Sequence, residues 1–344
     1  MRRQHTKEFH SAKHVALRGP RAQLLGGLNE ARTVNQRSSP SYRTVICALA
    51  TAYAALVALV SWHLVRGEGA GWYDREVLLQ SFELGQYTYL YVGGWIDLFQ
   101  NWSAWYMAVD NLAAHLGGFE STLVVLTFVV AAIYAAASLN TSMWLLPLLF
   151  MPIQVDLFDS QIRSACAGAL LIVAYRSDRV TVAVLLALIA ILFHAAAILL
   201  LGLWLAATVV VRICERGPKA RFRQLAAGFL SSVSAMILIW VCVLNDNRTE
   251  IYSVSVVLFC MLLLAVGTAA TRGQRLTPQT LFSLMLLLFV GIGGTLGLGT
   301  QRLLPLAMPV LAATFLGFRA PYRTISALLV LVAQPYWTVR WLGG

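Results

Sequence analysis

Residues 152–204 read PIQVDLFDSQIRSACAGALLIVAYRSDRVTVAVLLALIAILFHAAAILLLGLW, and this stretch decides the architecture of the chain. Its first part holds four polar side chains in quick succession: Asp156, Asp159, Gln161 and Arg163. An apolar segment, a basic turn and a second apolar run with a single histidine, His194, follow. Ionised groups are costly in hydrocarbon, so in membrane segments they usually face the protein interior or a water-filled cavity. Arg163 and His194 are therefore the candidate centre of a functional site.

The composition excludes an ordinary soluble protein. The chain has 344 residues, of which 59% are hydrophobic and 12% are charged, and its mean hydropathy is +0.71. Soluble domains are about half apolar and about one quarter charged. The apolar runs are long and continuous, whereas transmembrane β-strands alternate over about ten residues. The sequence thus predicts an all-α polytopic membrane protein with about 10–11 transmembrane segments, some of them half-length.

The distribution of the net charge of +11 argues against nucleic-acid binding. Nine of the 26 Lys and Arg residues precede Val45, and five more lie between Arg212 and Arg223. Basic clusters that flank membrane spans are retained on the cytoplasmic side. Residues 1–43 are polar and rich in arginine, which predicts a disordered cytoplasmic tail, and residues 44–344 are expected to form a single transmembrane domain.

The segment 66–120 follows the first span, expected at about residues 44–65, and should lie on the outer side. It holds seven of the fifteen acidic residues, only two arginines and many Trp and Tyr residues. One interpretation is an interfacial aromatic belt beside a solvated loop. The other is a surface that faces carbohydrate, because aromatic rings pack on the apolar faces of sugars and carboxylates accept hydroxyl protons. Its candidate residues are Asp74, Tyr87, Asp97 and Trp102.

Other apolar segments are expected at 121–138, 143–157, 162–175, 225–244, 252–271, 280–299, 303–318 and 322–341. Residues 102–116 are expected to form a helix that lies on or dips into the membrane, because polar residues such as Asp110 disfavour a lipid-exposed span. The glycine-rich segment 291–300, GIGGTLGLGT, has no strand before it. Close helix packing therefore explains it better than nucleotide binding does.

The apolar run 180–211 is too long for one span. Its 32 residues would form a helix of about 48 Å, whereas the hydrocarbon core is about 30 Å thick. A single span would also place two basic connections on opposite sides of the membrane. Two shorter segments that meet near His194 remove both conflicts. They also bring His194 to the outer side, where Arg163 is expected.

Each candidate residue also has a purely structural explanation. His194 can be a packed, hydrogen-bonded histidine of a helix bundle, and Arg163 can pair with Asp156 or Asp159. Arg302 can be an interfacial arginine whose charged group reaches water. No second His or Cys stands at ligand spacing from His194, and the five cysteines are scattered, so neither a metal site nor a cofactor is expected.

Two short motifs resemble those of a known family. DSQIRSACAGAL at 159–170 is similar to an Arg-Gln-x-Ala segment that opens a membrane helix, and LFHAAAIL at 192–199 is similar to a Phe-His-x-Ser/Ala segment. With the 31-residue spacing from Arg163 to His194, the acidic aromatic loop and the later Arg302, the chain resembles the EpsG-type exopolysaccharide polymerases, relatives in function of the Wzy O-antigen polymerases. The match is close over 156–204 and loose over 70–310, and Ser164 stands where the family has Gln.

The resemblance implies a GT-C-type glycosyltransferase of the bacterial inner membrane, which joins polyprenyl-diphosphate-linked oligosaccharide units on the outer side. Arg163 and Arg302 would stabilise the departing diphosphate, and His194 would act as a base or as a hydrogen-bond donor. A carboxylate such as Asp74 or Asp159 would orient the acceptor. The further substrate-binding candidates are Gln161, Asp156, Asp97, Trp102 and Tyr87.

The expected partners are the lipid-linked substrate, the lipid bilayer, a chain-length regulator and export proteins, with no nucleic acid. Two other functions stay open at this point. A transporter such as a flippase for lipid-linked oligosaccharide would explain buried charges in many spans, although the two halves of the chain show no internal repeat. A membrane acyltransferase would also use a buried histidine and arginine.

Overall fold

The computed structural model describes residues 40–59, 103–159, 161–194, 196–214, 219–243, 254–272, 274, 276–296 and 300–343. Within these ranges the secondary structure is entirely helical, with α-helices, short 3-10 helices and no strand. Ile46–Gly344 form one compact unit, and the contacts described below lie within it. Residues 1–39 of the expected basic tail lie outside the described part of the chain, as do residues 60–102, which include the end of the first expected span and the first part of the expected outer loop.

Among the described residues, four helices are long and apolar enough to cross a membrane: α3 (Pro40–Leu59), α8 (Phe119–Thr141), α13 (Ala196–Ile213) and α16 (Pro278–Thr295). A fifth span results if α10 (Pro152–Asp159) and α11 (Ile162–Arg176) are counted as one bent element. Two more helices are apolar but shorter: α12 (Val180–Phe193) and α15 (Val254–Ala270). The prediction of an all-α polytopic membrane protein with some half-length segments is confirmed.

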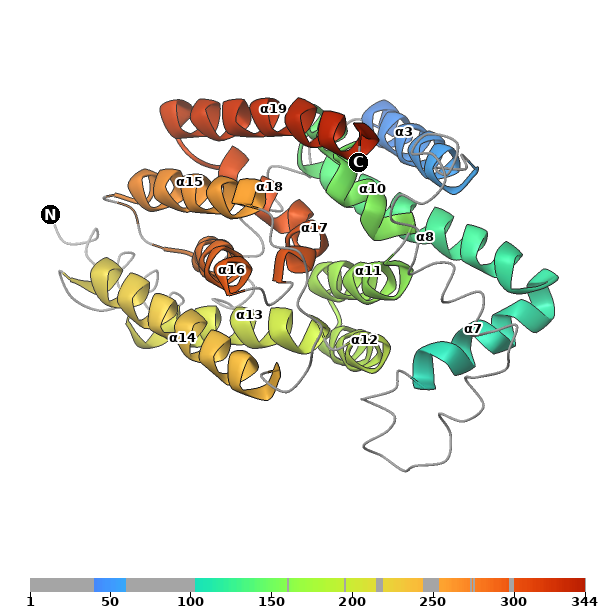
Figure 1. Ribbon diagram of the computed structural model, residues 1–344, viewed down its shortest axis with the longest axis horizontal. Helices are drawn as coiled ribbons and strands as arrows, with labels where there is room; N and C mark the ends of the chain where they lie inside the picture. The colour runs from blue at the N-terminus through green and yellow to red at the C-terminus, as the bar shows by residue number, and fades with distance from the viewer. Residues whose placement is uncertain are drawn as a thin grey trace, which may run out of the picture. The chain divides into compact units, whose positions relative to one another are not determined.

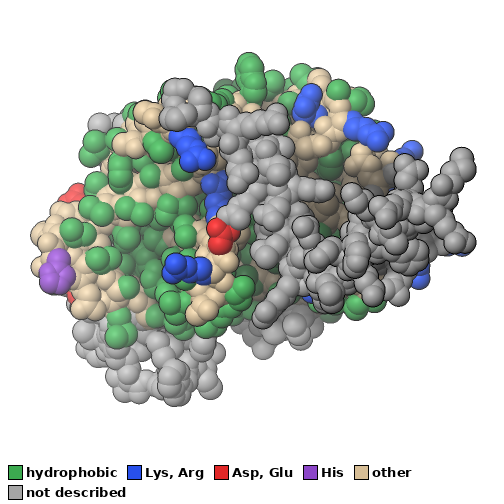
Figure 2. All heavy atoms as spheres, turned by 180° about the vertical axis from the view of Figure 1, so that it is seen from behind, with side chains coloured by type: hydrophobic (Ala, Val, Ile, Leu, Met, Phe, Trp, Pro, Cys, Tyr) green, Lys and Arg blue, Asp and Glu red, His purple; other side chains and the backbone are tan. Residues whose placement is uncertain are grey.

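The exposed surface agrees with helices that face lipid. Large hydrophobic side chains are strongly exposed on several helices, such as Val180 at 78%, Ile213 at 77% and Leu205 at 61%. On the face shown in Figure 2, hydrophobic side chains cover much of the described surface and basic side chains form small local groups. In water such extended apolar surface would drive association, whereas in a bilayer it is the expected exterior.

Two expected segments are broken into shorter helices. The segment at 143–157 divides into η2 (Met143–Leu145), α9 (Leu146–Leu149) and α10. The segment at 303–318 divides into α17 (Leu303–Leu306) and α18 (Met308–Leu316). Pro147, Pro152 and Pro309 stand at the starts of three of these pieces, where proline is tolerated because the first N–H groups of a helix have no internal partner. Both expected apolar segments are therefore present, each as a series of short helices.

Two glycines reverse the chain between α7 (Ser103–Leu116) and α8. Gly117 and Gly118 have φ values of 81° and 123°, a region that residues with a Cβ rarely adopt. The Gly118 N–H donates to the carbonyl of Ala113 at 3.0 Å and so closes the end of α7. The helix expected at 102–116 is confirmed, and the sharp turn brings it back against α8, which it contacts.

The run 180–211 breaks at His194, as expected from its length and flanking charges. α12 ends at Phe193 and α13 begins at Ala196. Figure 1 shows α11 and α12 side by side and almost end-on, whereas α13 runs across the view. Three small buried residues, Ala167, Ala190 and Ala197, pack together where the helices meet. Their short side chains permit the close approach that packing between membrane helices requires.

A chain of polar side chains joins α11, α16 and α18. The Tyr175 hydroxyl donates to Gln279 Oε1 at 3.4 Å, and Gln279 Nε2 donates to Thr314 Oγ1 at 3.2 Å. The Thr314 hydroxyl donates to the carbonyl of Val310, so the buried Ser283 hydroxyl, 2.8 Å away, is the donor in its contact with Thr314. Thr314 therefore accepts two hydrogen bonds from α16.

We expect Thr314→Val to lower the free energy of unfolding by about 1 kcal/mol, because two donors of α16 lose their acceptor inside the helix bundle. Thr208→Val is the matched control, since within the described part of the chain the Thr208 hydroxyl donates to the carbonyl of Trp204 in its own helix and to no other helix. Thermal unfolding of the purified variants in one detergent compares them. Equal stabilities of the two variants would contradict a stabilising role for this polar chain.

Candidate functional site

Arg163 and His194, which are distant in sequence, lie at the same end of one helical hairpin. Arg163 is in the first turn of α11, and His194 directly follows the last residue of α12. The two helices have 15 and 14 residues and pack against each other, joined by a turn of three residues. The start of α11 therefore lies beside the end of α12. Arg179, in the turn, lies about 20 Å away along the helix axes.

Arg302 joins this pair from a separate part of the chain. It ends η3 (Thr300–Arg302), which follows α16 and leads into α17. Burial and the positive charges of Arg163 and Arg302 lower the pKa of His194 from 6.5 to about 4, with burial as the larger cause. His194 lies in the break between α12 and α13, outside both helices, and its imidazole is neutral at neutral pH. Arg163 and His194 are half-buried and Arg302 is exposed, so this cationic cluster reaches the surface.

Close packing on α16 positions η3. Thr300 is only 5% exposed, and its Oγ1 donates to the carbonyl of Val290 at 3.2 Å. A Cβ at Gly293 would lie 2.5 Å from both Oγ1 and Cγ2 of Thr300, so glycine is needed at that position. Gly291 and Gly294 likewise leave room for side chains of α15. For its three described glycines, the interpretation of the glycine-rich segment as a packing element is confirmed.

We expect Gly293→Ala to displace Thr300, and with it Arg302, because the added methyl group needs the space of the threonine side chain. Overpacking of this kind costs about 1–3 kcal/mol of stability. Thr300→Ala removes both contacting atoms, so the double variant should recover part of the lost stability. Thermal unfolding of the two single variants and the double variant measures this coupling. Strict additivity of the two changes would show that the glycine does not make room for Thr300.

Tyr134 of α8 contacts both α11, which carries Arg163, and α17, which directly follows Arg302. Its hydroxyl donates from α8 to the carbonyl of Leu306 in α17 at 3.2 Å. It also covers Gly168 of α11, where an added Cβ would overlap the tyrosine hydroxyl. Leu306 is four residues after Arg302, and Gly168 is five residues after Arg163. One buried tyrosine thus holds α11 and α17 in a fixed arrangement.

The junction between α10 and α11 bends the chain by 102°. Gln161 stabilises the bend, because its Nε2 donates to Asp156 Oδ2 at 2.9 Å and its backbone N–H donates to the Asp156 carbonyl at 3.2 Å. Both residues were expected to contact substrate, and in this structure they bind each other. Asp159 is buried at the end of α10, with 5% exposure. The bend makes Arg163 part of a new helix N-terminus.

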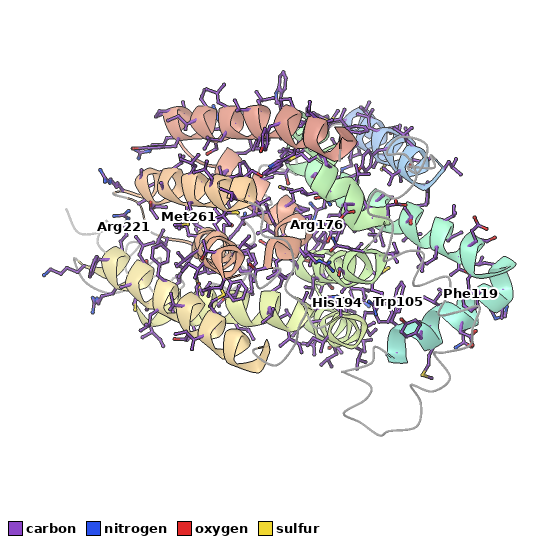
Figure 3. The ribbon with its side chains drawn as sticks, in the orientation of Figure 1. Trp105, Phe119, Arg176, His194, Arg221 and Met261 are labelled. Atoms are coloured by element: carbon purple, nitrogen blue, oxygen red, sulfur yellow. The ribbon has the colours of Figure 1, made fainter. Side chains whose placement is uncertain are left out.

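Two buried polar side chains near this region were not predicted as site residues. Gln154 of α10 is 1% exposed, and neither atom of its amide has a hydrogen-bond partner in the described part of the chain. The same holds for Nε1 of Trp105, which is also 1% exposed. The Trp105 ring packs edge-on against Phe193 at 5.6 Å, and Figure 3 shows Trp105 near His194. Buried polar atoms are nearly always bonded, so an unbonded one marks a place for water or a ligand. The sequence did contain a signal that could have identified Gln154, because a glutamine inside an apolar run is unusual.

Several predicted residues cannot be placed relative to this cluster. Asp74, Tyr87, Asp97 and Trp102 lie outside the described residues. In the described ranges, no three His, Cys, Asp or Glu side chains lie close enough together to hold a metal ion. The structure therefore brings together Arg163, His194 and Arg302, with Asp159 in the helix that precedes Arg163.

The arrangement is suited to binding an anion. Two guanidinium groups supply positive charge and planar sets of donors that match phosphoryl oxygens. The α11 N-terminus adds a partial positive charge, and its capping residue, Gln161, makes no side-chain hydrogen bond to the helix. The surrounding helices are apolar, which strengthens electrostatic attraction compared with water.

Comparison with known proteins assigns the chain to no family. No protein-family model matches the chain, and neither a curated protein nor a solved structure shows significant similarity to it.

Proposed function

We propose that the protein is a GT-C-type membrane glycosyltransferase that polymerises polyprenyl-diphosphate-linked oligosaccharide units into an exopolysaccharide or O-antigen chain. The observation that best supports this proposal is that Arg163 and His194 lie at the same end of the α11–α12 hairpin, with Arg302 near enough for its charge to lower the pKa of His194. A leaving diphosphate gains negative charge in the transition state, and fixed cations stabilise that charge. The resemblance of the Arg163 and His194 motifs to those of EpsG-type polymerases points to the same reaction.

The surroundings of the cluster fit an amphiphilic substrate. α12, whose last residue directly precedes His194, exposes a series of apolar side chains, among them Val184 at 52%, Leu185 at 56% and Leu188 at 54%. A polyprenyl chain gains free energy by contact with such a surface, while its diphosphate requires cations. The exposed apolar side chains of α12 suit the polyprenyl chain, and the positive charges of Arg163 and Arg302 suit the diphosphate.

In the proposed reaction, a hydroxyl oxygen of an incoming lipid-linked unit attacks the anomeric carbon of the growing chain. The bond from that carbon to the diphosphate oxygen breaks, and its electron pair leaves with the polyprenyl diphosphate. The hydroxyl proton passes to a base, and a carboxylate such as Asp159 or Asp74 orients the acceptor. The same proposal includes an inner-membrane location with a cytoplasmic N-terminus. It also includes a chain-length regulator and export proteins as partners.

The decisive experiment incubates the purified protein, in detergent or nanodiscs, with lipid-linked repeat units and resolves the products by size. A ladder of longer glycans is expected, together with release of one polyprenyl diphosphate for each bond formed. A protein that leaves the units unchanged, under conditions where they are accessible, does not have this activity.

The same preparation distinguishes the two alternative functions. A flippase would move a labelled lipid-linked unit across a sealed vesicle membrane without elongating it. An acyltransferase would consume acyl-CoA in the presence of an acceptor. Either result, without a ladder, would replace the polymerase proposal.

A further inference from the structure

Four basic residues lie at the ends of three helices, apart from the candidate site. Arg212 is one residue before the end of α13, Lys219 directly precedes α14 (Ala220–Val243), and Arg272 follows α15 by two residues. Arg221 is the second residue of α14. We call these four residues the basic patch. In Figure 3, Arg221 lies at one edge of the molecule, away from the labelled residues of the candidate site.

Two side chains of α14 hold these helix ends together. Gln224 Nε2 donates to the carbonyl of Val211 in α13 at 3.3 Å, and this glutamine is only 4% exposed. Arg221 Nη2 donates to the carbonyl of Thr268 at 2.8 Å and to Thr271 Oγ1 at 3.1 Å. The last carbonyls of a helix carry a partial negative charge and lack partners within the helix, so an arginine suits the end of α15. The basic residues on the three helix ends therefore lie close together.

The described helices supply no carboxylate to neutralise the basic patch. Three of its members are exposed, and Nε of Arg221 is buried without a hydrogen-bond partner in the described part of the chain. The described residues after Asp178 include no Asp or Glu. In the sequence, residues 212–223 hold five basic residues and one acidic residue, Glu215. Like charges repel one another, so a bound anion would stabilise the folded protein here.

Exposed apolar side chains adjoin the basic patch. Ile213, next to Arg212, is 77% exposed, and Phe222, in the first turn of α14, is 72% exposed. Leu205 and Leu230 are exposed farther along α13 and α14. A surface with basic groups at the helix ends and apolar groups along the helices suits a ligand that is itself amphiphilic. A free phosphate ion would make no use of the apolar side chains.

We propose that the basic patch binds the phosphate of an anionic phospholipid, whose acyl chains lie along the exposed apolar side chains of α13 and α14. Guanidinium groups match phosphoryl oxygens, and clusters of basic residues at a membrane surface attract anionic lipids. Arg221 has a positioning role in this site, because its hydrogen bonds join α14 to the end of α15. The exposed members, Arg212, Lys219 and Arg272, contact the headgroup. The inference depends on neither the candidate site nor the glycan substrate.

Native mass spectrometry of the full-length protein, released from detergent, tests this site with defined ligands. Phosphatidylglycerol and phosphatidylcholine with the same acyl chains compare an anionic headgroup with one that has no net charge, and inorganic phosphate represents the free anion. We expect phosphatidylglycerol to bind at least about tenfold more tightly than phosphatidylcholine, and more tightly than inorganic phosphate. Equal affinities for the two lipids would overturn the inference, as would phosphate that binds as tightly as phosphatidylglycerol.

Two double variants distinguish a site from general attraction between a basic protein and an anionic lipid. Arg212→Gln/Arg272→Gln removes two charges of the basic patch from different helices and leaves Arg221 in place. It should weaken the binding of phosphatidylglycerol about tenfold or more, with that of phosphatidylcholine unchanged. Arg43→Gln/Arg179→Gln is the matched control, because it removes the same charge from exposed residues outside the patch, and it should bind like wild type. Equal losses in the two double variants would overturn the inference.

Thermal unfolding provides a second measurement. Without lipid, both double variants should unfold at the wild-type temperature, because the substituted side chains are exposed. Phosphatidylglycerol should raise the unfolding temperature of the wild type and of the control more than that of Arg212→Gln/Arg272→Gln, since a ligand stabilises the form that binds it. An equal rise in all three proteins would contradict the site. Neither measurement uses the glycan ladder, so failure of the lipid site and failure of the polymerase proposal are distinguishable.

Discussion

Arg163→Ala should reduce the extension of lipid-linked glycan at least about 100-fold, with membrane levels of the protein close to wild type. Arg163 lies in the first turn of α11 beside His194. In the proposed reaction, its guanidinium would bind the phosphoryl oxygens of the leaving group. Arg163→Lys keeps the charge but loses the planar pair of donors, so it should recover only part of the activity.

Arg179→Ala is the matched control for this experiment. Arg179 is exposed in the turn at the opposite end of the same hairpin, so its removal should leave polymer lengths unchanged. Gel analysis of glycan from cells that express each variant at equal levels provides the readout. Wild-type chain lengths in Arg163→Ala would remove this residue from the site.

Gly168→Ala should destabilise the protein by about 1–3 kcal/mol, because the added methyl group needs the space of the Tyr134 hydroxyl. Displacement of Tyr134 also breaks its hydrogen bond to Leu306 and releases α17 from α8. Loss of activity should therefore accompany the loss of stability, since α17 follows Arg302 directly.

Tyr134→Phe tests this account in a double-mutant cycle. The phenylalanine lacks the hydroxyl that overlaps the new methyl group, so Gly168→Ala should cost less in its presence, with a coupling of about 0.5–3 kcal/mol. Gly202→Ala on α13 is the control, because among the described residues no atom of another helix lies within 4 Å of its added Cβ. That variant should be neutral or slightly more stable, since alanine favours helix over glycine. Equal losses in Gly168→Ala and Gly202→Ala would contradict the packing described here.

The sequence allowed the hairpin of the candidate site to be predicted. The basic turn and the length of the run 180–211 required a break near His194, and a hairpin centred on that turn pairs Arg163 with His194. These features are local, because they follow from helix rise, membrane thickness and the positions of charges along the chain. The interruptions at 143–159 and 303–316 were missed, although Pro147, Pro152 and Pro309 were visible, because apolar composition alone does not distinguish a full span from a series of short helices.

By itself, then, the sequence determined the all-helical membrane class and the turn of the chain that places Arg163 beside His194. Only the tertiary structure decided that Arg302 lies within reach of the same imidazole, and that Asp156 and Gln161 bind each other. It alone showed that Nδ1 of His194 is occupied by a backbone N–H. The physical reason is that Arg302 is positioned by packing between residues far apart in sequence, through Gly293, Thr300 and Tyr134. A short motif contains no information about such contacts.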